Sequence, residues 1–164
     1  MSVQMLTIEP ITLRETERIW QLRNDVATRR EFGMPVISYA QCLDWVATVT
    51  DRKTPEYVFL VRDAKMGNIG LIILEKHGAE IEIHVTIDPA HRVRRGYGKQ
   101  AIKLATDWAF MNGADRVVAN IREENYKGLF AFESSGYKEV RNYLGPRNIS
   151  YFEYEIRNDQ KKKY

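Results

Sequence analysis

The sequence predicts one α/β domain of the α+β kind, with a mixed, mostly antiparallel sheet flanked by helices in the order βααβββαβαββ. Three observations predict this class: apolar residues at helical spacing early in the chain, three closely spaced β-rich segments after them, and a strand–helix succession in the second half. The length of 164 residues suits one domain. We expect it to cover 1–157 and to leave a polar tail over 158–164.

The composition excludes several other classes. Hydrophobic residues make up 44% and charged residues 29%, which is typical of a globular protein. A single cysteine, Cys42, excludes a disulfide framework and a multi-cysteine zinc site, and we expect no metal. The net charge of +3 argues against a nucleic-acid partner. The sequence lacks a bilayer-length apolar run and a signal-peptide pattern, so we expect a cytoplasmic protein without membrane contact.

The first third predicts a short strand over 5–10 and two helices, over about 12–30 and 38–50. Both helices begin with the spacing of a capping box, Thr12 to Glu15 in the first and Ser38 to Gln41 in the second. A glycine and a proline separate them, and apolar residues at helical spacing give each helix one face for the core.

The middle of the chain predicts three strands, over 57–62, 69–75 and 80–88. Short turns join them, so they should form an antiparallel meander. The third strand alternates strictly between apolar and polar residues and therefore has two chemically different faces. Its polar face carries Glu80, Glu82, His84, Thr86 and Asp88.

The stretch 89–105 is the most informative segment because it is basic, contains glycines and lies where a strand gives way to a helix. A helix N-terminus offers unpaired N–H groups and a partial positive charge, and glycine lets a phosphate come close. We therefore expect an anion site, for a pyrophosphate; a glycine-capped basic surface turn is the alternative. The residues concerned are Arg92, Arg94, Arg95, Gly96, Tyr97, Gly98, Lys99 and Gln100.

Two common phosphate sites fit this segment poorly. The run from Gly96 to Ala101 satisfies the dinucleotide pattern G-x-G-x-x-G/A, but the next strand ends in Arg122 instead of the acidic residue that binds a ribose. A P-loop fails because Lys99 is followed by Gln100. After the helix, the pattern predicts a strand over 115–121, a helix over 125–135, and strands over 137–143 and 149–156.

Two motifs in this order resemble the GCN5-related N-acetyltransferase (GNAT) superfamily, across nearly the whole chain. Gly96-Tyr97-Gly98 matches the glycines of the signature [R/Q]-x-x-G-x-[G/A], which binds the pyrophosphate of acetyl-CoA in that family. Asn125 opens the next helix, and 130–137 ends it with glycine and tyrosine. The resemblance implies a GNAT-like fold and an acyltransferase that uses acetyl-CoA. A second, less specific resemblance is to the branch of ribosomal-protein alanine and flagellin amino-sugar acetyltransferases, and it rests on residues 22–25, 37–38 and Trp45.

Three positions depart from the family pattern. Val93 stands where the signature has arginine or glutamine, although neighbouring arginines can supply the charge. Phe132 replaces the tyrosine that serves many members as a general acid, and Gly128 replaces a small hydroxyl residue. A CoA thiol has a pKa near that of cysteine, about 8.5, so it can leave partly as thiolate and Phe132 does not exclude activity.

The resemblance also implies roles for single residues. The backbone of Thr86, Ile87 and Asp88 would hold the pantetheine arm, and Asn125 would contact or position the cofactor. The chemistry itself requires a base, because an ammonium with a pKa of about 10 must lose a proton before it attacks. Glu82 and His84 are the catalytic candidates, and the alternative is that both are ordinary surface residues.

The acceptor pocket should come from the first two helices, their joining loop and the last strands. Candidate substrate-binding residues are Trp20, Arg23, Asn24 and Phe32, each of which also suits packing or surface. A phosphate or carboxylate on the acceptor would suit Arg23, so a nucleotide-linked amino sugar or other small amine is preferred to a peptide N-terminus. A non-catalytic acyl-CoA sensor is the alternative from another class, and a homodimer stays an open option.

Overall fold

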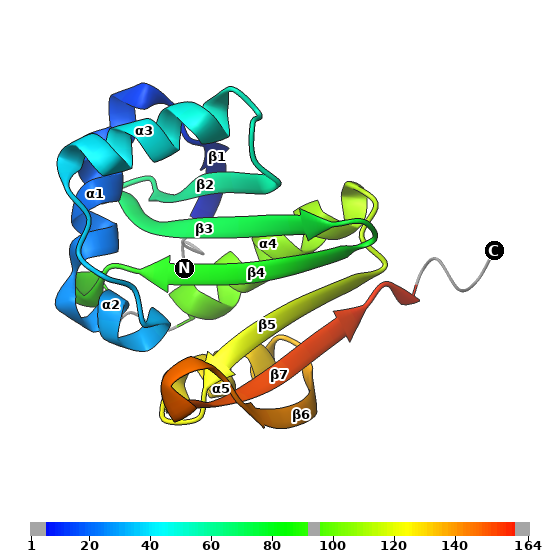
Figure 1. Cartoon of the computed structure of the whole chain (residues 1–164). Helices are drawn as coiled ribbons and strands as arrows, with labels where there is room; N and C mark the ends of the chain where they lie inside the picture. The colour runs from blue at the N-terminus through cyan, green and yellow to red at the C-terminus, as the bar shows by residue number, and fades with distance from the viewer. Residues whose placement is uncertain (1–5, 92–95, 160–164) are drawn as a thin grey trace.

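The computed structural model describes residues 6–91 and 96–159, which form a seven-stranded sheet with helices on both faces (Figure 1). The strands lie in the order β1-β2-β3-β4-β5-β7-β6. The strands are β1 (Leu6–Pro10), β2 (Glu56–Asp63), β3 (Gly67–His77), β4 (Glu80–Ile87), β5 (Arg116–Arg122), β6 (Lys138–Leu144) and β7 (Ser150–Arg157). The helices are α1 (Thr16–Asn24), α2 (Val26–Phe32), α3 (Tyr39–Thr50), α4 (Tyr97–Met111) and α5 (Tyr126–Ser134), with short 3-10 turns η1 (Leu13–Glu15), η2 (Pro89–His91) and η3 (Pro146–Asn148).

Two cores lie on opposite faces of the sheet. Val58 and Leu60 of β2 pack with α1 and α3 on one face, while Phe59 and Val61 of the same strand pack with α4 and α5 on the other. A strand that is covered on both sides must be apolar throughout, which explains the unbroken hydrophobic run in β2. The predicted mixed and mostly antiparallel sheet is confirmed. No described helix is long and apolar enough to cross a membrane.

The first predicted helix is the main local difference. The capping box of Thr12 and Glu15 forms, but it starts the 3-10 turn η1, and the chain then breaks at Asp25 into α1 and α2. Asp25 has extended backbone (φ −56°, ψ 133°), and its carboxylate accepts a hydrogen bond from the Thr28 N–H. This aspartate caps a new helix instead of continuing the old one. The second capping box starts α3 at Ser38 as predicted.

The feature that positions the site is the junction of β4 and β5. These strands are parallel and pair at three positions, from Glu80 with Arg116 to Glu82 with Val118. Beyond that point the described strands diverge toward their C-terminal ends, as Figure 1 shows. The divergence opens the sheet between the second halves of β4 and β5, where the register between the described strands ends.

Candidate active site

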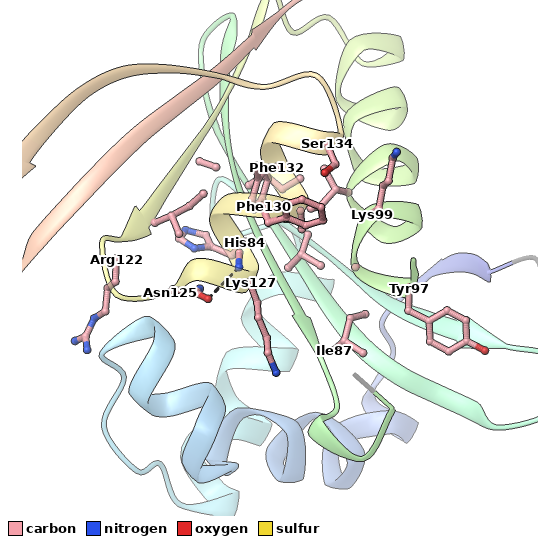
Figure 2. A pocket seen from close by; sticks show the side chains of 18 of the residues that line it. His84, Ile87, Tyr97, Lys99, Arg122, Asn125, Lys127, Phe130, Phe132 and Ser134 are labelled. Carbon is pink, nitrogen blue, oxygen red and sulfur yellow. Dashed lines mark hydrogen bonds between the residues drawn. The ribbon is translucent and has the colours of Figure 1, made fainter. Parts of the chain in front are cut away.

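A cavity lies in this opening, between the diverging strands and the helices α4 and α5 (Figure 2). It has a volume of about 530 Å³ and is called here the large cavity. Ile83, Val85 and Ile87 of β4 line it, so the apolar set of the alternating strand faces this side. The register between β4 and β5 ends at Glu82 and Val118, so the opening beyond it suits an extended ligand that pairs like an added strand.

The N-terminus of α4 closes one end of the large cavity. Gly96 adopts the left-handed region (φ 82°), which directs the chain into the helix, and Gly98 and Lys99 line the cavity beside it. The first-turn N–H groups of α4 have no partner within the helix and carry its partial positive charge. Nearby Lys127 of α5 adds a second cation. This end therefore has the features expected of a phosphate site.

Tyr97 points away from the large cavity and fixes the start of α4 (Figure 2). Its side chain is buried, and its hydroxyl donates a hydrogen bond of 2.7 Å to Oδ2 of Asp63. Oδ1 of Asp63 accepts hydrogen bonds from the backbone N–H groups of Lys65 and Met66. The glycine-rich turn is thus tied to the turn between β2 and β3.

Asn125 opens α5 and lines the large cavity. Its Oδ1 accepts a hydrogen bond of 3.0 Å from the Gly128 N–H, so it caps the helix. A Cβ at Gly128 would lie 2.6 Å from Nδ2 of Asn125, closer than real contacts allow. A side chain at position 128 would therefore require the Asn125 amide to shift.

The two aromatic residues at the end of α5 belong to the core. Phe132 is 7% exposed and packs edge-on against Tyr137, with ring centroids 4.9 Å apart. The Tyr137 hydroxyl lies 2.7 Å from that of Thr106, and burial raises the pKa of Tyr137 far above its ordinary value. Neither side chain is suited to give a proton to a leaving thiolate at neutral pH.

A second cavity of about 390 Å³ lies on the other face of the opening, toward α1 and α3. It is called here the acidic cavity, because it is lined by the carboxylates of Glu56, Glu75 and Glu82. Trp45 donates a hydrogen bond of 3.0 Å to Glu56, and the Glu75 carboxylate lies 3.1 Å from Nε2 of His77. Ligand atoms of Glu75, His77 and Glu82 lie within 4.8 Å of one another, and Glu75 and His77 are already in contact with each other.

Two residues line both cavities, His84 of β4 and Asn120 of β5. Nε2 of His84 lies 3.2 Å from Oε1 of Glu82, and Nδ2 of Asn120 donates a hydrogen bond of 3.2 Å to the same oxygen. The Tyr143 hydroxyl in turn donates to Oδ1 of Asn120 at 2.8 Å. The junction between the cavities is therefore a hydrogen-bonded network built from three strands.

The pKa of Glu82 is held below its ordinary value. The hydrogen bond to His84 is the largest cause; burial opposes it, while the hydrogen bond to Asn120 and the charge of His77 reinforce it. Glu82 therefore remains ionised at neutral pH and is a poor proton acceptor itself. It is well placed to orient the His84 ring, because a donor on Nε2 puts the lone pair of neutral imidazole on Nδ1.

The structure brings many of the predicted cofactor residues together and separates others. Thr86 lines the acidic cavity instead, Asp88 forms an ion pair of 2.7 Å with Arg18, and Gln100 is not among the described lining residues. Arg92, Arg94 and Arg95 lie outside the described residues. The predicted cofactor residues that do line the large cavity are Ile87, Gly96, Tyr97, Gly98, Lys99 and Asn125.

Of the four predicted acceptor residues, Arg23 lines the acidic cavity, with its guanidinium carbon 4.5 Å from the Trp45 ring centre. Burial lowers the pKa of Arg23. Trp20 and Asn24 are not among the described lining residues, because both side chains bind the backbone of Ile37, Trp20 at 2.9 Å and Asn24 at 2.8 and 2.9 Å. The side chain of Phe32 lies outside the described part of the chain.

Sequence reasoning missed several lining residues, above all Asn120, Arg122 and Tyr143. One signal was present: β5 is apolar at alternate positions, and the polar residues between them, Asn120 and Arg122, mark a second face. No local pattern pointed to Tyr143. It reaches the site because β7 pairs with β5 and β6 follows β7 in the sheet.

A sheet opened between two parallel strands, a helix N-terminus at its mouth and an acidic cavity behind it are features that suit an acyltransferase binding an acyl-CoA. The family model "Acetyltransferase (GNAT) domain" matches residues 5–138. The chain belongs to this family and is an N-acetyltransferase that uses acetyl-CoA. The fold class and cofactor predicted from the sequence are thus confirmed.

Solved structures show the same fold at low identity. Spermidine N-acetyltransferase from Vibrio cholerae, in complex with CoA and spermine, is 20% identical with a TM-score of 0.83, covering 94% of this chain and 96% of that one. A GNAT-family acetyltransferase from Bacillus anthracis is 18% identical, with a TM-score of 0.81 and coverage of 95% and 96%. An aminoglycoside acetyltransferase in complex with coenzyme A is 10% identical, with a TM-score of 0.81 and coverage of 96% and 98%. No curated protein sequence matches the chain.

Proposed function

We propose that this enzyme acetylates the primary amine of a small molecule, which binds in the acidic cavity while acetyl-CoA occupies the large cavity. The observation that carries the proposal is that His84 and Asn120 line both cavities. An amine in one cavity and a thioester in the other would meet beside them. The alternating polar and apolar faces of β4 separate the two compartments.

His84 is the proposed base and Glu82 its positioning residue. Glu82 holds Nε2 of His84 at 3.2 Å, so Nδ1 accepts the proton of the incoming ammonium. The free amine then attacks the thioester carbonyl and the C–N bond forms. The C–S bond breaks, the thiolate leaves with the electron pair, and the second proton of the attacking nitrogen passes through solvent to the thiolate. Backbone N–H groups of β4 that face the opening can stabilise the oxyanion. The low pKa of a thiol, about 8.5, removes the need for a side-chain acid at Phe132.

The charge of the acidic cavity supports a cationic acceptor. Three carboxylates face one guanidinium there, so an ammonium group would be attracted and held in its charged form until the base acts. The similar solved structures are those of enzymes named for spermidine and for aminoglycosides, both of which carry several amines. Two more specific acceptors are a nucleotide-linked amino sugar and a protein N-terminus, which correspond to the branch that the sequence resembles.

The test is an acetylation assay against small amines, amino sugars and peptides with free N-termini, followed by thiol release and mass spectrometry. H84Q and E82Q should each lower kcat at least about 100-fold, the lower end for loss of general-base catalysis. Both variants should still be stabilised by acetyl-CoA on heating. E17Q is the matched control, because Glu17 is exposed on α1.

Other outcomes would favour the other classes. Acetylation of peptides alone would identify an N-terminal acetyltransferase. Binding of acetyl-CoA without acetylation of any amine would favour a sensor. Full activity of H84Q would refute its assignment as the base.

A further inference from the structure

A third cavity, of about 370 Å³, collects four arginines from three separate elements and is called here the arginine cavity. Arg29 and Arg30 come from α2, Arg122 from the end of β5, and Arg147 from η3. These residues are far apart in the sequence, so the sheet order and the position of α2 bring them together. The mechanism proposed above uses none of them.

Their charge is largely uncompensated within the described residues. The described carboxylate nearest to any of them is that of exposed Glu124, 3.4 Å from Nη1 of Arg122. Among the described residues, buried Nε of Arg122 has no hydrogen-bond partner, and the side chain is 12% exposed. A buried donor without a partner is uncommon in a native protein, and a bound anion would complete it. Four guanidinium groups around one cavity select an anion with several oxygens, such as a phosphate.

Gly33 shapes this cavity. It ends α2 in the left-handed region (φ 64°), and a Cβ there would lie 2.7 Å from Nη2 of Arg122. Only a glycine both adopts this conformation readily and lets the guanidinium lie against the backbone. Figure 2 shows Arg122 extending from the end of β5 toward α2.

The arginine cavity adjoins the acceptor site. Met34 lines both the arginine cavity and the acidic cavity. Asn120, which binds Glu82, and Arg122 are two residues apart on β5, so they lie on one face at a spacing of roughly 7 Å. A ligand whose amine lies beside His84 therefore reaches Arg122 with a substituent a few bonds away.

Resting on the proposed function, we infer that the acceptor is a phosphorylated primary amine: its amine occupies the acidic cavity and its phosphate or diphosphate the arginine cavity. Sugar phosphates and nucleotide-linked sugars share this chemistry. Arg122 also lines the large cavity, so a phosphate of the cofactor is the competing occupant that an experiment must separate.

The first experiment measures binding without turnover. The enzyme is saturated with acetyl-CoA, which fills the cofactor's own phosphate site, and its thermal midpoint is followed as pyrophosphate is added. Stabilisation is expected for the wild type and for R14Q, whose arginine is exposed on η1, but not for R122Q or R147Q. Absence of stabilisation in the wild type would overturn the inference whether or not any amine is acetylated.

The second experiment compares an amino sugar with its phosphate ester and its nucleotide-diphosphate derivative as acceptors. Loss of one charge-assisted hydrogen bond corresponds to at least about a 10-fold change in affinity. We expect a preference of that size for a phosphorylated acceptor. R122Q and R147Q, the latter at an exposed position, should abolish this preference by raising the KM for the phosphorylated acceptor. A higher KM for acetyl-CoA instead would assign the arginines to the cofactor. If no acceptor of either kind is acetylated, the proposed function fails, and the pyrophosphate result still decides the subsite.

Discussion

Removal of one hydroxyl at Tyr97 should loosen the cofactor end of the site without disturbing its packing. The Tyr97 side chain is 2% exposed, and its hydroxyl donates to the Asp63 carboxylate at 2.7 Å. A hydrogen bond to a charged group contributes about 1.5–3 kcal/mol to stability. In a chain of 164 residues each kcal/mol moves the thermal midpoint by about 2–4 °C, so Y97F should lower it by roughly 3–12 °C.

The same variant should raise the KM for acetyl-CoA several-fold, because the start of α4 would no longer be tied to the turn after β2. Thermal unfolding and initial rates at varied acetyl-CoA measure the two effects, and urea unfolding gives the free energy of unfolding. Y126F is the matched control, since Tyr126 is 77% exposed, and it should change the free energy of unfolding by less than about 0.5 kcal/mol. A midpoint for Y97F within 1 °C of the wild type would refute the reasoning.

Three further predictions concern β4 and its neighbours. The pKa of Glu82 is lowered, first by its hydrogen bond to His84. The ionised carboxylate therefore stabilises the fold above the unfolded pKa of about 4.3, and this stabilisation is lost as the pH falls through the lower folded pKa. E82Q should cost less stability at pH 3 than at pH 7, as measured by urea titration. R116M removes the guanidinium shared by three carboxylates of β4 and β7 and should cost about 1–3 kcal/mol, less in 1 M salt. In G70A a Cβ would lie 2.5 Å from the Thr86 carbonyl oxygen, so unfolding experiments should show a loss of about 1–3 kcal/mol.

The sequence predicts the fold well because its strongest signals are local. The capping box at Ser38, the alternating burial of the first half of β4 and the glycine that caps α4 each depend on neighbours a few residues away, and each forms as expected. The break at Asp25 was missed because an aspartate within an apolar helical pattern resembles an ordinary solvent-facing residue.

The acceptor side is predicted less completely because it depends on long-range pairing. The network from Glu82 through Asn120 to Tyr143 crosses β4, β5 and β6, and the order β5-β7-β6 decides which side chains meet. Trp20 and Asn24 have the residue types of a binding site, yet their polar atoms are used by the backbone of Ile37. Polar residue type alone does not distinguish a ligand contact from a buried structural hydrogen bond.

The two charged cavities beside each other give the enzyme a means of discrimination that neither provides alone. A polycation such as spermidine would be attracted to the carboxylates of the acidic cavity and repelled by the arginines beyond Met34. A phosphate ester without an amine would be attracted to the arginines and repelled by the carboxylates. Under the inference drawn above, a molecule with both charges, separated by roughly the 7 Å between alternate residues of one strand face, would satisfy both cavities. Specificity would then come as much from the repulsion of ligands with the wrong charge as from the attraction of the right one.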